Sequence, residues 1–392
     1  MSDRVRFLDG LRGILACIVF VHHFFYAFWP NIVFGGPYEE FSSTSAFSGY
    51  KLIALTPLNI LYNPGMAIHF FFLLSGYVQT YNYFHKPDFV FLQKSFIKRY
   101  FRLAIPTLSV LLLVFLFHRA HLFTKDLIPQ NSVTSGWVKS LLPDNLNLFQ
   151  VIRHGLVECF SVKSNYYQVL WTMPTELANS WMVLILLFIT HRLKNATRVF
   201  VLWLLAQVFL MEAYYGAAFT LGMLICSVEK NIPKFSAYFG KTYVRFLCLS
   251  IGLYFASYPF VGYVDSTKNS FYGPISFFEK VPHIISYLFG DLLLFCFFLH
   301  SERSKNFLAQ KLFLFLGNIS FMFYLVHFLI LLSFTPWVFN VLSFHVGFTT
   351  NILLSGLSTF MLVLGASYIL YKYVDRLTLR LCSLYLKKLF NI

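Results

Sequence analysis

Long apolar stretches recur along the chain and are separated by short polar segments. A helix needs about 20 apolar residues to cross the hydrocarbon core of a bilayer. By this criterion the pattern predicts ten membrane-spanning helices, over residues 13–29, 62–84, 102–119, 176–191, 199–213, 214–228, 243–259, 281–300, 312–334 and 350–372. The fifth and sixth ranges abut at Tyr214-Tyr215-Gly216, which predicts a tight helical hairpin. We therefore expect one all-α integral membrane domain over residues 1–392.

The basic residues predict the orientation of these helices, because cytoplasmic loops collect Lys and Arg. With the N-terminus in the cytoplasm, 23 of the 31 Lys and Arg residues lie in or beside the predicted cytoplasmic segments, which are 1–12, 85–101, 192–198, 229–242, 301–311 and 373–392. We expect both termini to be cytoplasmic, with a basic cytoplasmic tail over 376–392. Two long loops, roughly 30–61 and 120–175, then lie on the other side and are expected to fold over other parts of the molecule.

Composition excludes a soluble protein. Hydrophobic residues make up 58% of the 392 positions and charged residues 12%, about half the usual charged fraction. A soluble domain of this size could not bury so much apolar surface. The net charge of +15 comes from short clusters between apolar runs, which is typical of cytoplasmic loops and not of a nucleic-acid partner. The six cysteines form no CxxC pair, so neither a disulfide framework nor a metal site is predicted.

The first apolar range contains an arginine and a histidine at a suggestive spacing. Arg12 and His23 are eleven residues apart, so one helix would place them on the same face, roughly 16 Å apart. Arg12 then lies at the cytoplasmic border and His23 near the middle of the membrane. Ionisable groups at that depth are costly and tend to mark function. For Arg12, anchoring at the cytoplasmic surface is an equally good interpretation.

Further charged residues lie at the ends of later ranges. Arg99 and Arg102 are three residues apart and share one helix face. Together with Arg12 they form a candidate guanidinium cluster for phosphates, although their spacing alone favours positive-inside anchoring. Glu176 enters the fourth range, where a carboxylate requires a partner, a proton or a polar cavity.

Four polar residues are candidates for lining a substrate cavity. His69 and Ser75 lie in the second range, where Ser75 and the following glycine are also typical of close helix packing. Ser320, Tyr324 and His327 share one face of the ninth range, for which aromatic packing is the alternative. We take His69, Ser75, Tyr324 and His327 as the cavity candidates.

In chain order these segments resemble the acyltransferase-3 family of membrane proteins. The matching pieces are LDGLRG with the Arg-to-His spacing of eleven, FFFLLSGY, RYFR followed by Pro106, LWTMPTE and ISFMFYLVH. The resemblance runs from Phe7 to about Asp375 and is closer to eukaryotic, fungal-type members than to bacterial glycan-modifying ones. His69 is a departure, because bacterial members often carry an acidic residue at that position.

The resemblance implies transfer of an acyl group, usually acetyl, from acyl-coenzyme A to a hydroxyl of a carbohydrate, lipid or small metabolite. Arg12 and His23 match the family's Arg/His motif, and Arg99 and Arg102 match its RxxR motif. We expect the three arginines to hold the coenzyme's phosphates and the thioester to lie near His23. His23 then acts as a general base or as a histidyl acyl relay, and Glu176 orients it or pairs with its charge.

Two other classes of protein remain alternatives. A secondary transporter or channel also carries buried His, Glu and Asp residues, and a membrane scaffold needs no chemistry at all. A transporter has no need of an arginine cluster for phosphates at its cytoplasmic mouth, so these arginines favour the enzyme. We expect a multi-pass protein of an endomembrane or the plasma membrane, surrounded by lipid.

The sequon at Asn195-Ala-Thr197 tests the predicted topology. It lies in a segment expected to be cytoplasmic, so it should carry no glycan when the protein is made in a eukaryotic host. Electrophoretic mobility before and after treatment with an N-glycosidase measures this, and a sequon introduced within residues 30–61 serves as the positive control. A glycan at Asn195 would overturn the topology.

Overall fold

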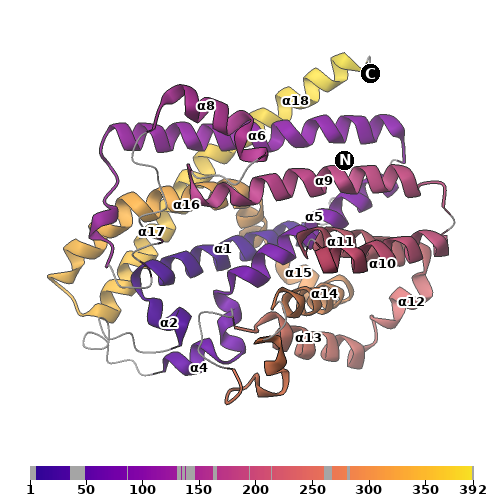
Figure 1. The fold of residues 1–392 in the computed structure, drawn as a ribbon, viewed down its shortest axis with the longest axis horizontal. Helices are drawn as coiled ribbons and strands as arrows, with labels where there is room; N and C mark the ends of the chain where they lie inside the picture. Colours follow the sequence, from indigo (N-terminus) through magenta and orange to yellow (C-terminus); the bar gives the residue numbers. More distant parts are fainter. Residues whose placement is uncertain are drawn as a thin grey trace. The chain divides into compact units, whose positions relative to one another are not determined.

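Every regular element that the structure describes is a helix, which confirms the predicted all-α class (Figure 1). Helices satisfy their backbone hydrogen bonds internally, as an apolar environment requires. The computed structural model describes residues 6–35, 49–85, 87–129, 134, 137, 146–161, 166–193, 195–212, 214–259, 267–279 and 283–390.

All ten predicted ranges coincide with helices. These are α1 (Arg6–Phe28), α5 (Pro64–His85), α6 (Phe89–Arg119), α9 (Thr172–Thr190), α10 (Asn195–Glu212), α11 (Tyr214–Asn231), α13 (Thr242–Ala256), α14 (Ile284–His300), α16 (Lys311–Ser343) and α17 (Phe348–Leu370). The shorter elements are α2 (Pro30–Phe34), α4 (Tyr50–Ala54), η1 (Pro57–Leu61), η2 (Lys125–Leu127), α8 (Leu148–Leu156), η3 (Glu158–Phe160), η4 (Gln168–Trp171), α12 (Pro233–Tyr238), η5 (Gly273–Glu279), α15 (Glu302–Leu308), η6 (Tyr371–Asp375) and α18 (Arg376–Leu389).

Several helices are suited to crossing a membrane. In the described part of the chain, five are long and apolar enough, namely Arg6–Phe28, Phe89–Arg119, Gln168–Thr190, Lys311–Ser343 and Phe348–Leu389. The bent pair of α14 and α15 makes a sixth if it is one broken span. Ten crossings with cytoplasmic termini therefore stay a prediction.

The chain forms two compact units. The first comprises Met1–Val19, Lys51–Phe96 and Ala178–Gly317, and the second comprises Phe20–Tyr50, Ile97–Leu177 and Asn318–Ile392. Helix α1 contributes its first part to one unit and the rest to the other. Each unit is described below by itself.

In the first unit, glycines bring α5 and α11 close together. Gly76 faces the backbone of Phe219, and Gly222 faces the backbone between Leu73 and Tyr77. Small residues permit such approach, and close packing drives helix association in membranes. Gly76 therefore has the packing role that the sequence offered for this position.

The predicted hairpin of the fifth and sixth ranges is confirmed. Helix α10 ends at Glu212 and α11 begins at Tyr214. A side-chain atom at Gly216 would lie 3.2 Å from the ring of Phe209, so the two helices are in contact next to the turn.

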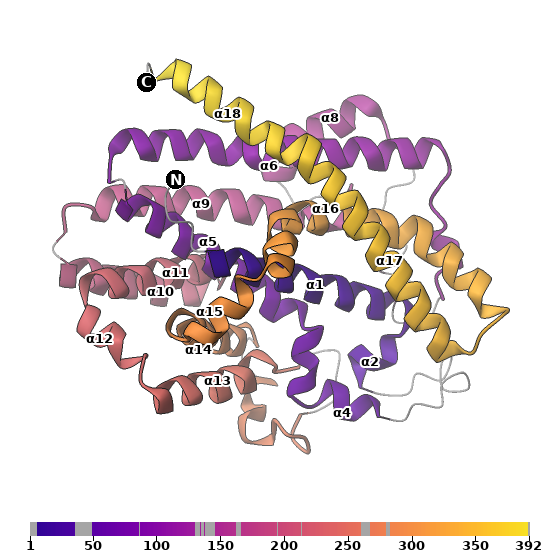
Figure 2. The same cartoon turned by 180° about the vertical axis from the view of Figure 1, so that it is seen from behind.

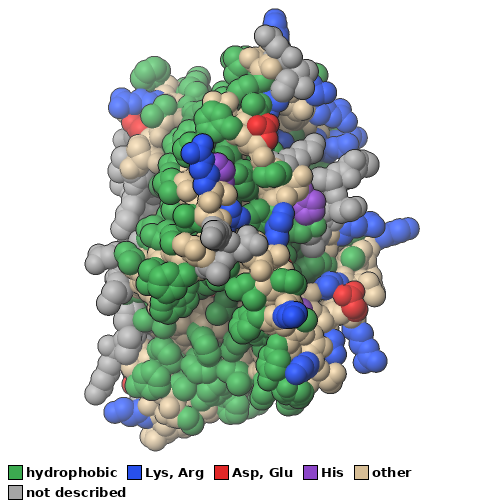
Figure 3. Space-filling view, turned by 90° about the vertical axis from the view of Figure 1, so that its right-hand side faces the viewer, with side chains coloured by type: hydrophobic (Ala, Val, Ile, Leu, Met, Phe, Trp, Pro, Cys, Tyr) green, Lys and Arg blue, Asp and Glu red, His purple; other side chains and the backbone are tan. Residues whose placement is uncertain are grey.

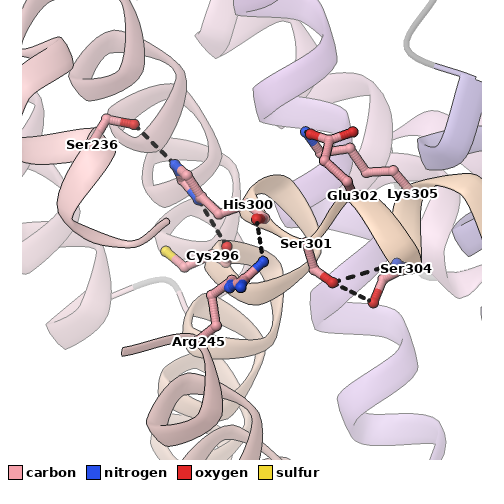
Figure 4. Close-up of polar contacts among 8 residues, drawn as sticks. All are labelled: Ser236, Arg245, Cys296, His300, Ser301, Glu302, Ser304 and Lys305. Atoms are coloured by element: carbon pink, nitrogen blue, oxygen red, sulfur yellow. Dashed lines mark hydrogen bonds and ion pairs between the residues drawn. The ribbon is translucent and has the colours of Figure 1, made fainter. Parts of the chain in front are cut away.

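A sharp break separates α14 from α15, which are bent by 92° (Figure 4). Arg245 of α13 donates to the carbonyl of His300, the last residue of α14, at 3.3 Å. His300 donates from Nδ1 to the Cys296 carbonyl at 2.9 Å, so its Nε2 accepts from the Ser236 hydroxyl at 3.1 Å. Ser301 then caps the N-terminus of α15 with its hydroxyl. These contacts satisfy polar groups that a helix break leaves open.

In the second unit, parts of the predicted loop 120–175 lie against α16. The Thr124 amide donates to the carbonyl of Leu332 at 3.0 Å. The Tyr167 hydroxyl donates to the carbonyl of Leu325 at 2.9 Å. The expectation that this loop folds over other parts of the molecule is thus confirmed for these two residues.

Apolar side chains are also abundant on the surface. On the face drawn in Figure 3, hydrophobic side chains form broad areas, and Lys and Arg outnumber Asp and Glu. Along α17, Leu353, Leu357 and Met361 follow one another at four-residue spacing and are all exposed. Such a stripe on a helix of this hydropathy is typical of a lipid-facing surface.

Because α5 and α11 are in such close contact, one methyl group added between them should strongly destabilise the protein. Gly222→Ala should lower the free energy of unfolding by about 1–3 kcal/mol, because the new Cβ would overlap the carbonyl of Leu73. Gly365→Ala is the matched control in α17, because no heavy atom lies within 4 Å of its added Cβ. Thermal unfolding in detergent compares the two variants, and equal midpoints would contradict this account of the packing.

Candidate active site

Two histidines meet in the second unit. Nδ1 of His23, in α1, lies 3.0 Å from Nε2 of His327, in α16. Their rings are nearly parallel, with centroids 5.2 Å apart. His327 is fully buried and His23 is partly buried. The structure therefore joins two residues that the sequence placed in separate helices and in different roles.

A backbone carbonyl determines which nitrogens carry protons in this pair. Nδ1 of His327 lies 2.6 Å from the carbonyl oxygen of Tyr324, which can only accept a hydrogen bond. A neutral His327 therefore donates from Nδ1 and accepts at Nε2. His23 must then donate from its own Nδ1, which leaves the lone pair of a neutral His23 at Nε2. No described residue forms a hydrogen bond with that Nε2.

Aromatic rings surround His23. The Trp137 ring lies parallel to the His23 imidazole within 11°, with centroids 6.3 Å apart. The Phe328 ring meets the imidazole edge to face at 4.6 Å and also contacts Trp137. These rings restrict the orientation of the imidazole and keep much of its surface from water.

Tyr324 connects this pair to the start of α9. Its hydroxyl donates to the carbonyl of Val169 at 2.7 Å and lies 3.0 Å from the Thr172 hydroxyl, which is itself 3.3 Å from the same carbonyl. The turn η4 leads directly into α9 at Thr172, and Pro174 sits in the first helical turn, where its missing N–H is not needed. Tyr324 thus links α16 to the junction between η4 and α9.

One turn further along α9, Glu176 forms a salt bridge with Arg99 of α6. Both side chains are mostly buried, with 15% and 16% of their surface exposed. A carboxylate beside a guanidinium tolerates such burial because each charge offsets the other. The structure thus supplies the partner that a carboxylate at this position requires. The predicted catalytic role of Glu176 beside His23 stays a prediction, because the hydrogen-bond partner of His23 is His327.

The arginines of the two motifs lie on unbroken helices. Arg12 and His23 are both in α1, and Arg99 and Arg102 are both in α6. Helix α6 begins at Phe89, well before the predicted start of the third range, because charged residues are compatible with a helix beyond the lipid. Arg12 belongs to the first unit, and its part in a phosphate cluster stays a prediction.

His69 and Ser75 lie in α5 of the first unit, and both are buried. His69 donates from Nδ1 to the carbonyl of Gly65 at 2.6 Å, and its ring stacks on Tyr215. Of the four cavity candidates, the structure thus brings His327 to His23, and Tyr324 contacts His327. The cavity role of His69 and Ser75 stays a prediction.

Trp137, Phe328 and Thr172 were not singled out from the sequence. Trp137 lies in the long loop 120–175, whose aromatic content was a general signal without a position. Phe328 is adjacent to His327 in an apolar run and carries no distinguishing pattern. Thr172 is part of LWTMPTE, so it could have been found through its motif. Among the residues that the structure describes, no group of three or more His, Cys, Asp or Glu side chains could hold a metal ion.

Comparison with known proteins gives consistent relatives. Acyltransferase clz18 of Cochliobolus lunatus is 23% identical, and the match covers 94% of this chain and 93% of that protein. Acyltransferase R4 of Phoma sp. is 22% identical over 85% of this chain and 84% of its own length. O-acetyltransferase PaAT-1 of Phomopsis amygdali is 25% identical over 60% of this chain and half of its own length. No solved structure matches the chain.

The family match covers nearly the whole chain. The family described as an acyltransferase domain matches residues 5–372, which include the three motif arginines and both His23 and His327. The relatives named above are two acyltransferases and one O-acetyltransferase. This chain therefore belongs to the acyltransferase-3 family.

Proposed function

We propose that this protein transfers an acyl group, most simply acetyl, from acyl-coenzyme A to a hydroxyl, with Nε2 of His23 as the general base. The observation that carries the proposal is the hydrogen-bond chain from His23 through His327 to the carbonyl of Tyr324. It orients the imidazole and leaves a lone pair on the nitrogen that no described residue occupies. A base needs both features.

The reaction requires one proton to move twice. Nε2 of His23 takes the proton of the acceptor hydroxyl as that oxygen attacks the thioester carbonyl carbon. The carbon–sulfur bond then breaks, and the leaving sulfur takes the proton back from Nε2. The products are an ester and coenzyme A with a free thiol, and His23 returns to its neutral form. No metal is needed for this sequence of steps.

His327 acts as a positioning residue in this scheme. When Nε2 of His23 is protonated, the positive charge spreads to its Nδ1–H, which points at Nε2 of His327. The Tyr324 carbonyl beyond His327 extends the same chain of dipoles. Hydrogen bonds polarise one another in a low-dielectric site, so the chain stabilises the transient charge. The same nitrogen of His23 would carry the acyl group if the transfer used a histidyl relay.

Arg99 and Arg102 are proposed to hold the phosphates of the coenzyme. Guanidinium groups bind phosphate oxygens in pairs of hydrogen bonds. Arg99 is already paired with Glu176, which holds its side chain in one place. A transporter would not require both such an arginine pair and an oriented imidazole, so these features favour an enzyme.

His23→Ala should abolish acyl transfer and leave the protein folded, because the base is lost while the helix is not. His327→Ala should lower kcat by about 10²-fold with little change in KM, because His23 loses the group that orients it. Release of free thiol from acetyl-coenzyme A, by purified protein in nanodiscs with a panel of hydroxyl acceptors, measures both.

His345→Ala is the matched control, because this histidine is exposed in the turn after α16. It should leave turnover and the thermal midpoint unchanged. Turnover like that of the unmodified protein in His23→Ala would rule out its proposed role.

Arg102→Ala should weaken binding of acetyl-coenzyme A by about tenfold, the usual effect of removing a charged hydrogen bond. Arg99→Ala should weaken binding similarly and also lower the thermal midpoint, because it removes the guanidinium that offsets the charge of the buried Glu176 carboxylate. Calorimetric titration and thermal unfolding of the same samples separate these effects.

The double variant Arg99→Ala with Glu176→Ala should recover most of the thermal midpoint but not the affinity. Lys98→Ala is the charge control on the same helix, because this side chain is exposed. Donor affinity that stays unchanged in both arginine variants would contradict the phosphate assignment.

A further inference from the structure

A serine and a histidine meet beside the break between α14 and α15, within the first unit (Figure 4). The hydroxyl of Ser236, in α12, donates to Nε2 of His300 at 3.1 Å. Nδ1 of the same ring donates to the carbonyl of Cys296 at 2.9 Å, so a neutral ring keeps its lone pair at Nε2. A hydroxyl is thus paired with a base that a third group orients, which is the arrangement that activates serine nucleophiles.

The position of Ser236 directs its side chain at the histidine. Helix α12 joins α11 to α13 and lies at the edge of the first unit (Figure 1, Figure 2). The other residues of this helix are all exposed, whereas Ser236 is 8% exposed. The His300 side chain is partly exposed. The pair therefore lies just beneath the surface, and part of the base is accessible from outside.

Two negative groups offset the positive charge that the His300 ring would gain by taking a proton. His300 is the last residue of α14, and the carbonyls at a helix C-terminus favour a cation there. Glu229 of α11 lies within electrostatic range of His300, and its carboxylate accepts from the Tyr77 hydroxyl at 2.6 Å. A negative group near the base stabilises the imidazolium of serine hydrolases in the same way.

The surroundings of the pair favour an anionic reactant. From 230 to 245 the chain carries four basic residues and no acidic one. One of them, Arg245, has its Nη1 3.3 Å from the carbonyl oxygen of His300. Clustered charge of one sign raises the local concentration of a ligand of the opposite sign. The segments 229–242 and 301–311 are predicted to be cytoplasmic, the side on which the proposed donor, acyl-coenzyme A, is expected.

We propose that Ser236 is a nucleophile that accepts an acyl group from a thioester, with Nε2 of His300 as its base, and that water then releases the acid. The protein would thus also hydrolyse acyl-coenzyme A at a site separate from His23. Only the identity of the donor rests on the function proposed above.

The step is balanced by one proton that moves twice. Nε2 of His300 takes the proton of the Ser236 hydroxyl as that oxygen attacks the thioester carbonyl carbon. The carbon–sulfur bond breaks, and the leaving sulfur takes the proton from Nε2. The products are an ester of Ser236 and coenzyme A with a free thiol. Water then attacks the ester with the same base, which gives a carboxylic acid and restores the Ser236 hydroxyl.

A fluorophosphonate probe tests the pair without any acyl donor, because an activated serine oxygen attacks the phosphorus and displaces fluoride. The full-length protein in nanodiscs is labelled and digested, and its peptides are identified by mass spectrometry. Ser236 should be labelled. Ser304 should not, because its hydroxyl lies 2.9 Å from that of Ser301 and is not paired with a histidine. His300→Ala should slow labelling of Ser236 by at least about 10²-fold, and Ser304→Ala, the matched control, should leave it unchanged.

Acetyl-coenzyme A should add an acetyl group to the Ser236 peptide and slow later labelling by the probe. A hydroxyl that only anchors α12 predicts no label at Ser236, and this result would overturn the proposal. Equal labelling rates in the unmodified protein and in His300→Ala would also overturn it. If His300→Ala fails to fold, the Ser236 and Ser304 peptides of the unmodified protein are compared, and equal labelling of both would contradict an activated serine.

The failure of the donor assignment is distinguishable from the failure of the serine site. A labelled Ser236 that takes no acetyl group, in a protein that still releases thiol to a hydroxyl acceptor, would overturn the acyl-transfer step at Ser236. A labelled Ser236 in a protein that releases no thiol with any acceptor would count against the function proposed above and would support the activated serine.

Discussion

Polar groups inside a bilayer must find their hydrogen-bond partners within the protein, and most of this structure follows from that requirement. Backbone groups meet it by forming helices. Where a helix breaks, as between α14 and α15, Arg245 and Ser236 satisfy the groups around His300. Where a polar side chain is buried, a carbonyl one turn away on the same helix can accept from it, as the carbonyl of Gly65 does for His69.

In the pair of His23 and His327, the need for hydrogen-bond partners within the protein also determines the proposed chemistry. The carbonyl of Tyr324 accepts from His327 because it has no intrinsic ability to donate. Because this hydrogen bond can run in only one direction, Nε2 of His327 must accept from Nδ1 of His23. His23 therefore keeps its lone pair on Nε2. The acyl transfer proposed for this acyltransferase-3 member thus depends on an ordinary helix carbonyl.

The salt bridge between Arg99 and Glu176 shows that buried charged side chains also need a partner within the protein. Neither side chain could be so deeply buried alone, since an unpaired charge in a low dielectric is very unfavourable. Their pairing also joins α6 to α9 next to the junction that Tyr324 holds. The proposed donor site and the proposed base are therefore supported by neighbouring turns of α9, at Glu176 and at Thr172.

The sequence by itself determined the helices, because apolar runs and the spacing of residues along one helix are local properties of the chain. It placed all ten apolar ranges on helices, the arginine and histidine of the first motif on α1, and both arginines of the second on α6. The tertiary structure decided the partners. His23 and His327 are 304 positions apart, Arg99 and Glu176 are 77 apart, and Trp137 reaches His23 from a loop. Hydropathy and helical spacing carry no information about such contacts, because they depend on which helix faces pack together.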